Sequence, residues 1–480
     1  MTQKIGIIQI NDTHANLLPT EDARYTATGF QIEKLGGYAR IATKINEYRK
    51  KHGNNLLVFD NGDTFHGTYE AVNSKGEVMV PYLKQLGINA MTFHWDSAYT
   101  IPHLLKLEEK INYPILATNV YYEGTKDLVF KPTATFEVDG VTIGVIGIAS
   151  NIIRSNMPKP FWEGTEFTNG IEETKKQIAA LKSENVDLIL VLSHLGYPQD
   201  IELIRQVDGI DIYLSGHTHN RLRQVEKFND TYIIQSGSLA TSIGYLELSL
   251  EEKTLKDVSH KFIVLDETIK EDETIISMLE NDPILLESKT YLDVEVGESK
   301  IDLHRGSSFS STMDYLLLDA MRYLTSLDIA FSNGWRYGGG IKAGKLSRRH
   351  LYQIVPMDPA IMTAELTGEE IFNMLEANLE ATFSCEPFKQ MGGYIKRNSG
   401  LKIYFKLENP KGQRIQRIFV KDQELDYHKT YKVAYVTRQA VPEIFGKNHQ
   451  TFGKNAIEAM ELFLKEKPFQ RDDTESYIPV

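Results

Sequence analysis

The residues most able to do chemistry are aspartates and histidines that stand where predicted strands end. In chain order they are Asp12, His14, Asp63, His94, His194, His217 and His219. Carboxylate and imidazole donors without a thiolate suit divalent ions such as Mn, Fe, Co or Zn, and seven donors are enough for two ions that share one carboxylate. Two neighbouring ions can activate a water and hold the oxygens of an anionic ester. A single such residue usually caps a loop, but seven in succession favour a dinuclear metal site.

The first half of the chain has the pattern that would position these residues. Short apolar segments alternate with longer amphipathic ones, which is typical of βαβ units. Strands are predicted at residues 5–10, 56–59, 90–93, 115–118, 141–148, 188–192, 212–215 and 232–235, and helices at 37–51, 78–86 and 170–184. Sites in α/β sheets form at the ends of strands. We therefore predict an N-terminal α/β sandwich over residues 1–265 that carries the metal site.

The second half has a different pattern. Residues 266–290 are rich in Glu, Asp, Lys and Ile at near-helical spacing, so we predict an exposed linker helix there. An α+β domain is predicted over residues 291–480. Its helices are expected at 310–325, 368–379 and 456–465, and its strands at 329–331, 401–406, 415–420 and 432–435.

Composition narrows the functional classes. The chain has 480 residues, of which 41% are hydrophobic, and its net charge of −12 argues against binding to nucleic acid or to an anionic membrane. The single cysteine, Cys385, excludes an internal disulfide and a Cys-rich zinc site. No apolar segment approaches the roughly 18 residues of a membrane span. A strand begins within a few residues of Met1, which leaves no space for a signal peptide, so a cytoplasmic location is expected.

The order of the motifs resembles the calcineurin-like metallophosphoesterases, and the whole chain resembles the 5'-nucleotidase family. The matching motifs are Asp12-Thr-His14, Gly62-Asp63, the lone His194 and Gly216-His217-Thr-His219. This resemblance implies an N-terminal four-layer α/β metallophosphoesterase sandwich, joined by a helix to a C-terminal α+β 5'-nucleotidase-type domain that binds substrate. It also implies two divalent ions (Mn, Zn, Fe or Co). Asp12, His14 and His219 would bind one ion, His194 and His217 would bind the other, and Asp63 would bridge the two.

The chain departs from the family pattern at Thr92-Phe93-His94-Trp95-Asp96, where the family has Gly-Asn-His-Glu. His94 replaces the Asn ligand, and an imidazole can take over metal binding. Trp95 replaces the His that stabilises the transition state or protonates the leaving group, and an indole cannot donate a proton catalytically. We predict that His94 belongs to the catalytic site. His66, three residues after Asp63, is a candidate donor, and the alternative is that it is only a loop histidine.

Candidate substrate-binding residues lie in the second half. Arg336 in the segment Asn333-Gly-Trp-Arg-Tyr-Gly338, and Arg397 close to Tyr394, could hold an anion by bidentate hydrogen bonds. The alternative is that both arginines are solvated. Tyr394, Phe388 or Phe445 could stack on a nucleotide base, although the Gly-Gly-Asp-Gly motif that precedes one stacking ring in the family is absent.

Three functions follow from these observations. The first is a dinuclear-metal phosphohydrolase that cleaves a nucleotide or a related small anionic phosphate ester by attack of a metal-bridging hydroxide. The second is a hydrolase of a sulfur or other ester, because the His94-Trp95-Asp96 triplet is similar to the thiosulfohydrolase branch of the superfamily. The third is a metal-bearing binding protein with weakened catalysis. Retention of all seven ligand positions argues against the third, since buried polar clusters are costly to keep.

Overall fold

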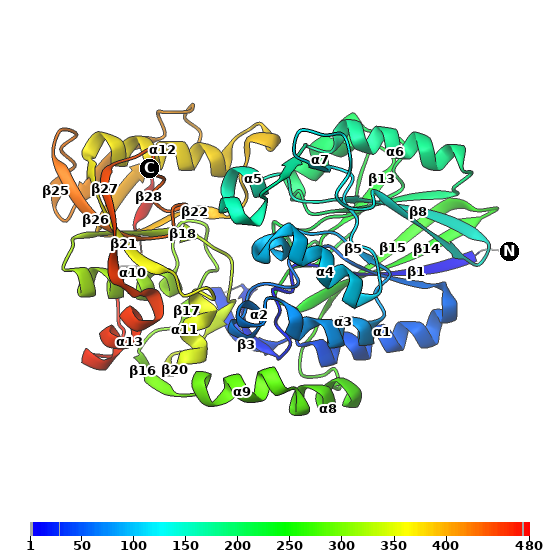
Figure 1. Ribbon diagram of the computed structural model, residues 1–480, viewed down its shortest axis with the longest axis horizontal. Helices are drawn as coiled ribbons and strands as arrows, with labels where there is room; N and C mark the ends of the chain where they lie inside the picture. Colours follow the sequence, from blue (N-terminus) through cyan, green and yellow to red (C-terminus); the bar gives the residue numbers. More distant parts are fainter. Residues whose placement is uncertain (1–2, 28, 473–474) are drawn as a thin grey trace. The chain divides into compact units, whose positions relative to one another are not determined.

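A computed structural model of the chain describes residues 3–27, 29–472 and 475–480 (Figure 1). Its contacts divide the chain into two units, which are described separately. The first unit comprises Met1–Thr20 and Lys34–Leu286, and the second comprises Glu21–Glu33 and Glu287–Val480. None of the described helices is long and apolar enough to cross a membrane.

The described part of the first unit contains two large sheets and a two-stranded sheet of β6 (Val120–Tyr122) and β9 (Thr165–Phe167). The first sheet has the order β15-β14-β1-β4-β5. Its strands are β1 (Gln3–Ile10), β4 (Leu56–Asp60), β5 (Ala90–Met91), β14 (Ser242–Glu251) and β15 (Thr254–Val264). The second sheet has the order β12-β13-β11-β10-β8-β7. Its strands are β7 (Thr133–Val138), β8 (Val141–Ile148), β10 (Leu188–Ser193), β11 (Ile212–Leu214), β12 (Glu226–Phe228) and β13 (Thr231–Ile234).

One apolar core lies between these two sheets, and helices cover their outer faces. Ile7 and Phe59 of the first sheet share a buried cluster with Leu190 and Leu214 of the second. A further cluster joins the first sheet to α1 (Tyr38–His52), α3 (Val80–Leu86), α4 (Ile101–Ile111) and α8 (Glu273–Asn281). Helices α6 (Ile171–Ser183) and α7 (Tyr197–Gln206) lie beside the second sheet (Figure 1). The predicted four-layer α/β sandwich is therefore confirmed.

Several parts of this unit differ from the sequence prediction, which did not include α4, α7, β7 or β12. Residues 115–118 form isolated bridges at Ile115 and Leu116 and no regular strand. The long hairpin β14–β15, which completes the first sheet, was not predicted. Its two-residue turn, Glu252-Lys253, has φ angles of 49° and 62°. Such turns usually contain Asn-Gly or Asp-Gly, and this one has neither pair.

The predicted linker helix is two helices, α8 (Glu273–Asn281) and α9 (Pro283–Leu292). The break falls at Asp282, whose Oδ1 accepts hydrogen bonds from the N–H groups of Ile284 (2.9 Å) and Leu285 (3.1 Å). Pro283 has no N–H to continue α8 and is favoured in the first turn of a helix. Ile275 and Leu279 of α8 are buried in the core of the first unit, so α8 is part of that unit.

The second unit is an α+β domain, as predicted. Its main sheet has the order β22-β18-β26-β21-β27, and a smaller sheet has the order β25-β24-β23-β28. The strands are β18 (Ile329–Gly334), β21 (Ala360–Thr367), β22 (Tyr394–Ser399), β23 (Leu401–Phe405), β24 (Ile415–Val420), β25 (Gln423–Glu424), β26 (Thr430–Val436), β27 (Lys447–Asn455) and β28 (Tyr477–Pro479). The helices are α10 (Thr312–Thr325), α11 (Arg348–Ile354), α12 (Gly368–Phe383) and α13 (Ala456–Glu466). Phe331, Leu375 and Phe405 are among the residues of its buried core.

Shorter elements complete the two units. They are α2 (Tyr69–Asn73), α5 (Ile153–Asn156), β6 (Val120–Tyr122), β9 (Thr165–Phe167), β16 (Glu295–Ser299), β17 (Leu303–His304), β19 (Gly340–Ile341) and β20 (Gly344–Ser347).

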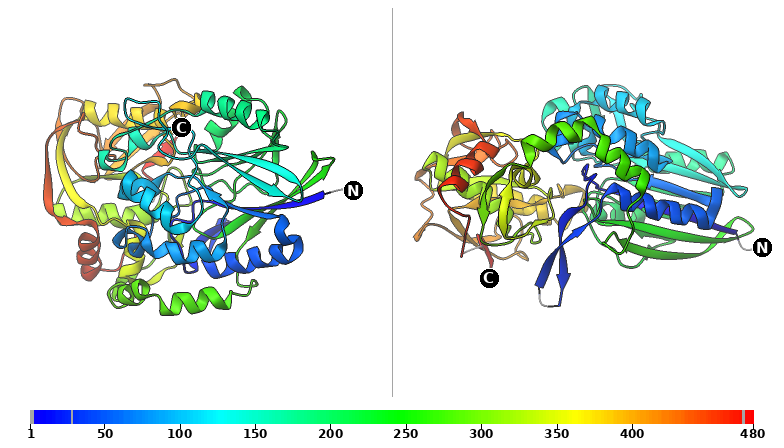
Figure 2. Two further views of the ribbon diagram at one scale, coloured as in Figure 1. Left: turned by 45° about the vertical axis from the view of Figure 1, so that its right-hand side comes forward. Right: turned by 90° about the horizontal axis from the view of Figure 1, so that it is seen from below.

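A hairpin from the N-terminal half of the chain packs in the second unit. It consists of β2 (Thr20–Thr26) and β3 (Gly29–Leu35) and is the dark blue hairpin in the right-hand view of Figure 2. The Oε2 atom of Glu21 accepts a hydrogen bond from the Lys342 N–H at 2.8 Å. Asp22 contacts Gly339 so closely that a Cβ at position 339 would lie 2.5 Å from Asp22 Oδ1. The chain thus passes between the two units three times.

Candidate metal centre

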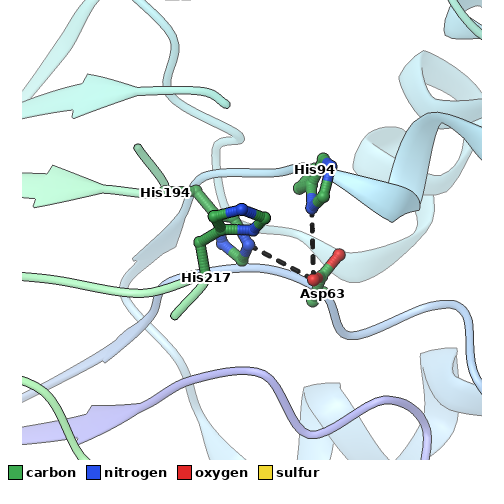
Figure 3. Close-up of side chains that lie close together, drawn as sticks. All are labelled: Asp63, His94, His194 and His217. Atoms are coloured by element: carbon green, nitrogen blue, oxygen red, sulfur yellow. Dashed lines mark hydrogen bonds and ion pairs between the residues drawn. The ribbon is translucent and has the colours of Figure 1, made fainter. Parts of the chain in front are cut away.

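Four of the predicted ligands form one group in the first unit. Asp63, His94, His194 and His217 each offer a donor atom, and these atoms lie within 4.8 Å of one another. Asp63 and His94 follow β4 and β5 of the first sheet, whereas His194 and His217 follow β10 and β11 of the second. Figure 3 shows the two imidazoles of His94 and His194 approaching the Asp63 carboxylate. All four side chains are buried.

The other three predicted ligands form a second group. Asp12 and His14 follow β1, His219 follows β11, and their donor atoms also lie within 4.8 Å of one another. The two groups adjoin. Asp63 Oδ2 lies 3.8 Å from His14 Nε2 in the second group, and His194 Nε2 lies 3.5 Å from Asp12 Oδ1. Asp63 therefore faces both groups, which is the position that a bridging carboxylate needs.

The backbone of this site is strained. Five of the seven residues have φ in the left-handed region: Asp12 (51°), His14 (47°), Asp63 (54°), His217 (70°) and His219 (59°). Non-glycine residues rarely adopt this conformation, which costs about 1–3 kcal/mol each where it is sparsely populated. Such strain persists where the surrounding structure enforces it, and it is concentrated at functional sites. The repeated strain supports a functional role for the two groups.

The charges of the site are strongly coupled. Burial raises the pKa of the Asp12 carboxyl, but His194 and His219 outweigh that effect and lower the pKa to about 2. Burial likewise raises the pKa of Asp63, and His94, His194 and His14 bring it well below its usual range. Burial lowers the pKa of His194, whereas Asp63 and Asp12 raise it to about 9. Both carboxylates thus keep their negative charge and require positive neighbours.

The donor set fits divalent metal ions. Two carboxylates and five imidazoles, with no thiolate, are gathered in two adjoining groups that share Asp63. Nitrogen and oxygen donors of this kind suit Mn, Fe, Co and Zn. Asp12, His14 and His219 would hold one ion, and His94, His194 and His217 would hold another, with Asp63 between them.

Asp96 organises the loops that carry Asp63 and His94. Its carboxylate accepts hydrogen bonds from the backbone N–H groups of Asp63, Thr64 and Phe65, each at 2.8 Å, and of His94 at 3.2 Å. The sequence prediction did not assign it a role. The signal was present, since Asp96 ends the His94-Trp95-Asp96 triplet, but its partners are backbone groups that no motif identifies.

A buried polar network supports the histidine side of the site. Asn61 Nδ2 donates to the carbonyl oxygens of Ser193 (2.8 Å) and Leu214 (2.7 Å), so it ties β4 of the first sheet to the second sheet. His194 Nδ1 donates to the Asn61 carbonyl at 2.5 Å. This hydrogen bond keeps Nδ1 protonated, so that Nε2, which lies 3.3 Å from Asp63 Oδ2, is the ring nitrogen that would bind a metal ion. Asp200, also missed from the sequence, accepts hydrogen bonds from Ser193 Oγ (2.7 Å) and Ser215 Oγ (2.5 Å).

His66 and Trp95 lie against each other beside the first group. Their ring centroids are 5.2 Å apart in a stacked arrangement. His66 is buried, and burial, aided by His14, lowers its pKa to about 3. Its imidazole is therefore neutral at neutral pH, which is not the charge state of a strong proton donor. The backbone N–H of Trp95 donates to Asp63 Oδ1 at 2.7 Å, so Trp95 positions this carboxylate by its main chain.

The three predicted substrate-binding residues differ in their surroundings within the second unit. The guanidinium of Arg336 makes no hydrogen bond or ion pair with any residue that the structure describes. Arg397 is buried and donates to the Ser307 and Ser308 carbonyls at 2.8 Å each, and its Nε lies 3.3 Å from Asp314 Oδ2. The Arg397 guanidinium thus has protein partners on several of its N–H groups, and its predicted role in holding an anion stays a prediction. Arg397 also lies over the ring of Tyr394, 5.0 Å from its centroid.

Comparison with known proteins assigns the two halves to families. The model of the calcineurin-like phosphoesterases matches residues 5–221, and the model of the 5'-nucleotidase C-terminal domain matches residues 289–437. The snake venom 5'-nucleotidase of Naja atra is 25% identical over 487 aligned residues, which cover 90% of this chain and 88% of the relative.

Two solved structures share the fold over nearly the full chain. The sulfate thiohydrolase SoxB of Thermus thermophilus has a TM-score of 0.90 at 20% identity and covers 99% of this chain and 96% of its own. A 5'-nucleotidase precursor, also of Thermus thermophilus, has a TM-score of 0.86 at 23% identity and covers 100% and 99% of the two chains. The chain belongs to the 5'-nucleotidase family of calcineurin-like metallophosphoesterases. It is a hydrolase of that class.

Proposed function

We propose that the protein is a dinuclear-metal phosphohydrolase that cleaves a nucleotide or a related small anionic phosphate ester. The observation that carries the proposal is the pair of adjoining Asp/His groups, with Asp63 facing both. Two divalent ions held there would activate a water and neutralise the charge of the ester oxygens. The chain itself positions the ligands through Asn61 and Asp96, and it shields them from bulk water, since all seven except the partly exposed His219 are buried.

The choice between phosphate and sulfur esters depends on the His94-Trp95 pair. His94 lies within the first group, and the Trp95 ring stacks on His66. The triplet His94-Trp95-Asp96 favours a second candidate function, hydrolysis of a sulfur ester, and the similar fold named above is that of a sulfate thiohydrolase. We prefer nucleotide cleavage because the Naja atra relative, which this chain matches over 88% of that protein's length, is a 5'-nucleotidase.

The decisive experiment is a substrate panel with the purified protein and added Mn²⁺. It would compare nucleoside 5'-monophosphates, nitrophenyl phosphate, nitrophenyl sulfate and a thiosulfonate, with Asp63→Asn as the inactive control. Cleavage of phosphate esters that is lost in the control supports the proposal. Cleavage of sulfur esters alone would establish the second candidate. Bound ions without turnover of any ester would indicate a binding protein.

The same panel tests the missing acid. Trp95 stands where the family has its proton donor, and the neutral His66 is a weak substitute. General acid catalysis contributes about 10²- to 10⁴-fold in rate, so nitrophenyl phosphate should be cleaved faster than nucleoside monophosphates by a factor in that range. Equal wild-type rates on the two substrates would show that a proton donor is present. If the His66→Ala variant then lost activity on the nucleotide alone, His66 would be that donor.

A cytoplasmic location stays a prediction that cell fractionation can test.

A further inference from the structure

The two Asp/His groups share one short loop, residues 216–220, which follows β11. His217 belongs to the first group and His219 to the second, so this loop supplies one imidazole to each. Both residues have φ in the left-handed region, a conformation that non-glycine residues rarely adopt. Such a backbone persists only where the surrounding structure enforces it. The loop must therefore be held by contacts from outside it.

The side chain of Gln235 supplies several of these contacts. Gln235 directly follows β13 and is fully buried. Its Oε1 accepts hydrogen bonds from Thr218 Oγ1 at 3.1 Å and from the Asn220 N–H. Its Nε2 donates to the Gly216 carbonyl at 2.5 Å and to Ser215 Oγ at 2.7 Å. These partners stand before, between and after the two histidines.

Every hydrogen-bonding position of this amide is used. A glutamine side chain has two N–H donors and one oxygen with two lone pairs, and its four partners here satisfy all of them. The partners also fix the orientation of the amide, because a main-chain N–H can only donate and a main-chain carbonyl can only accept. An apolar side chain at position 235 would leave these loop groups without their partner.

A second link extends from this loop to the loop that carries His194. Thr218 Oγ1, which donates to Gln235, accepts a hydrogen bond from the Tyr197 N–H at 3.0 Å. Tyr197 stands three residues after His194, which belongs to the first group. The Thr218 hydroxyl thus joins Gln235 to both histidine loops.

We propose that Gln235, acting through Thr218 and the loop backbone, is a positioning residue that places His217 and His219 for both metal ions at once. The inference rests on the proposed function, since it requires that the two groups hold two ions. Gln235 is not itself one of the candidate ligands. A loop that is fixed before an ion arrives loses little freedom when the ion binds, so Gln235 raises the affinity for each ion.

Metal titration of the full chain tests this role. The metal-free protein is titrated with Mn²⁺ in a calorimeter, which gives the affinities for the first and the second ion. Gln235→Met keeps the length of the side chain and removes its hydrogen bonds, so both affinities should fall by about 10- to 100-fold. Unchanged affinities, or a loss for one ion only, would overturn the inference.

Thr218 provides a conservative pair of variants. Thr218→Ser keeps the hydroxyl and should bind both ions within about threefold of wild type, whereas Thr218→Val removes it and should lose about tenfold for each. Equal affinities in these two variants would contradict the proposal, which requires the hydroxyl. Should Gln235→Met fail to fold, the Thr218 pair still decides.

A matched control separates positioning from a general loss of stability. Asn119 is another fully buried amide of the first unit, and its side chain makes three hydrogen bonds, all with Ala149 and Thr168. Asn119→Leu should lower the free energy of unfolding, as Gln235→Met does, but leave both metal affinities unchanged. The same loss of metal affinity in both variants would show that Gln235 acts only on stability and would overturn its positioning role.

Hydrogen exchange in the metal-free protein observes the loop without any ion. A peptide that covers residues 216–220 should exchange at least about tenfold faster in Gln235→Met than in wild type, because the Asn220 N–H loses its acceptor. Unchanged exchange, or two ions in the wild type with unchanged affinities in Gln235→Met, overturns this inference alone. Fewer than two ions in the wild type overturns the proposed function and the inference with it.

Discussion

Asp63 Oδ2 lies 3.3 Å from ring nitrogens of both His94 and His194 and 3.8 Å from His14 Nε2. This carboxylate faces histidines of both groups and so could hold two ions together. Its left-handed backbone and the Trp95 N–H that binds its other oxygen show that the fold enforces this position.

Asp63→Asn should therefore reduce the metal content from two ions to one or fewer per chain, because the amide removes the shared negative charge. Loss of a group that hydrogen-bonds to a metal ligand lowers metal affinity by roughly 10- to 100-fold. Loss of the bridging ligand itself should lower the affinity for the second ion by more than that. Elemental analysis of the dialysed protein measures this. Asp257→Asn, at an exposed position, is the matched control. Two ions in Asp63→Asn would show that Asp63 does not bridge.

His94 allows a paired test of ligand chemistry. His94→Asn should retain both ions, because an amide oxygen can replace the imidazole as a donor, whereas His94→Ala should lower the occupancy of the ion that His194 and His217 hold. Metal titration of both variants side by side measures the difference. Equal occupancy in the two variants would remove His94 from the set of ligands.

The loops after β4 and β5 depend on each other through Asp96. This residue lies in the short 3-10 helix Trp95–Tyr99, and four backbone N–H groups of the two loops donate to its carboxylate. Neither strand by itself determines where its loop lies, so the metal ligands are positioned by a contact between elements.

Asp96→Asn should lower the free energy of unfolding by about 2–4 kcal/mol, because an amide leaves some of these buried N–H groups without an acceptor. It should also weaken metal binding by about 10- to 100-fold. Denaturant unfolding in the presence of a chelator gives the first quantity, and metal titration gives the second. Asp139→Asn, in a left-handed turn, is the control. Wild-type metal affinity in Asp96→Asn would contradict the positioning role.

The first unit holds every residue of the metal centre and every hydrogen-bond partner described for it. A chain that ends at Leu286, with residues 21–33 replaced by a short Gly/Ser turn, should bind two ions and cleave nitrophenyl phosphate. The end point must include α8, since Ile275 and Leu279 belong to the core of this unit. Elemental analysis and a colorimetric assay measure the outcome. Loss of an ion from a folded truncated chain would show that the second unit completes the site.

Much of this protein could be read from the sequence because the relevant signals are local. The alternation of apolar strands and amphipathic helices predicted the sandwich, and the polar residues at strand ends predicted one site with donors for two ions, since sheet topology brings strand ends together. The division of these residues between the two ions was implied by the resemblance to the family. The departure at His94-Trp95 was equally visible.

Other features depended on tertiary structure because their causes lie far apart in the chain. Arg397 and Lys396 are adjacent on one strand, yet the fold pairs Arg397 with Asp314, whereas Lys396 forms no ion pair with any described residue and donates to the Gln439 carbonyl. The hairpin β2–β3 follows β1 in sequence but packs in the second unit. A residue's type sets which interactions it can make, but only the packed structure decides which partners reach it and whether water remains to solvate its charge.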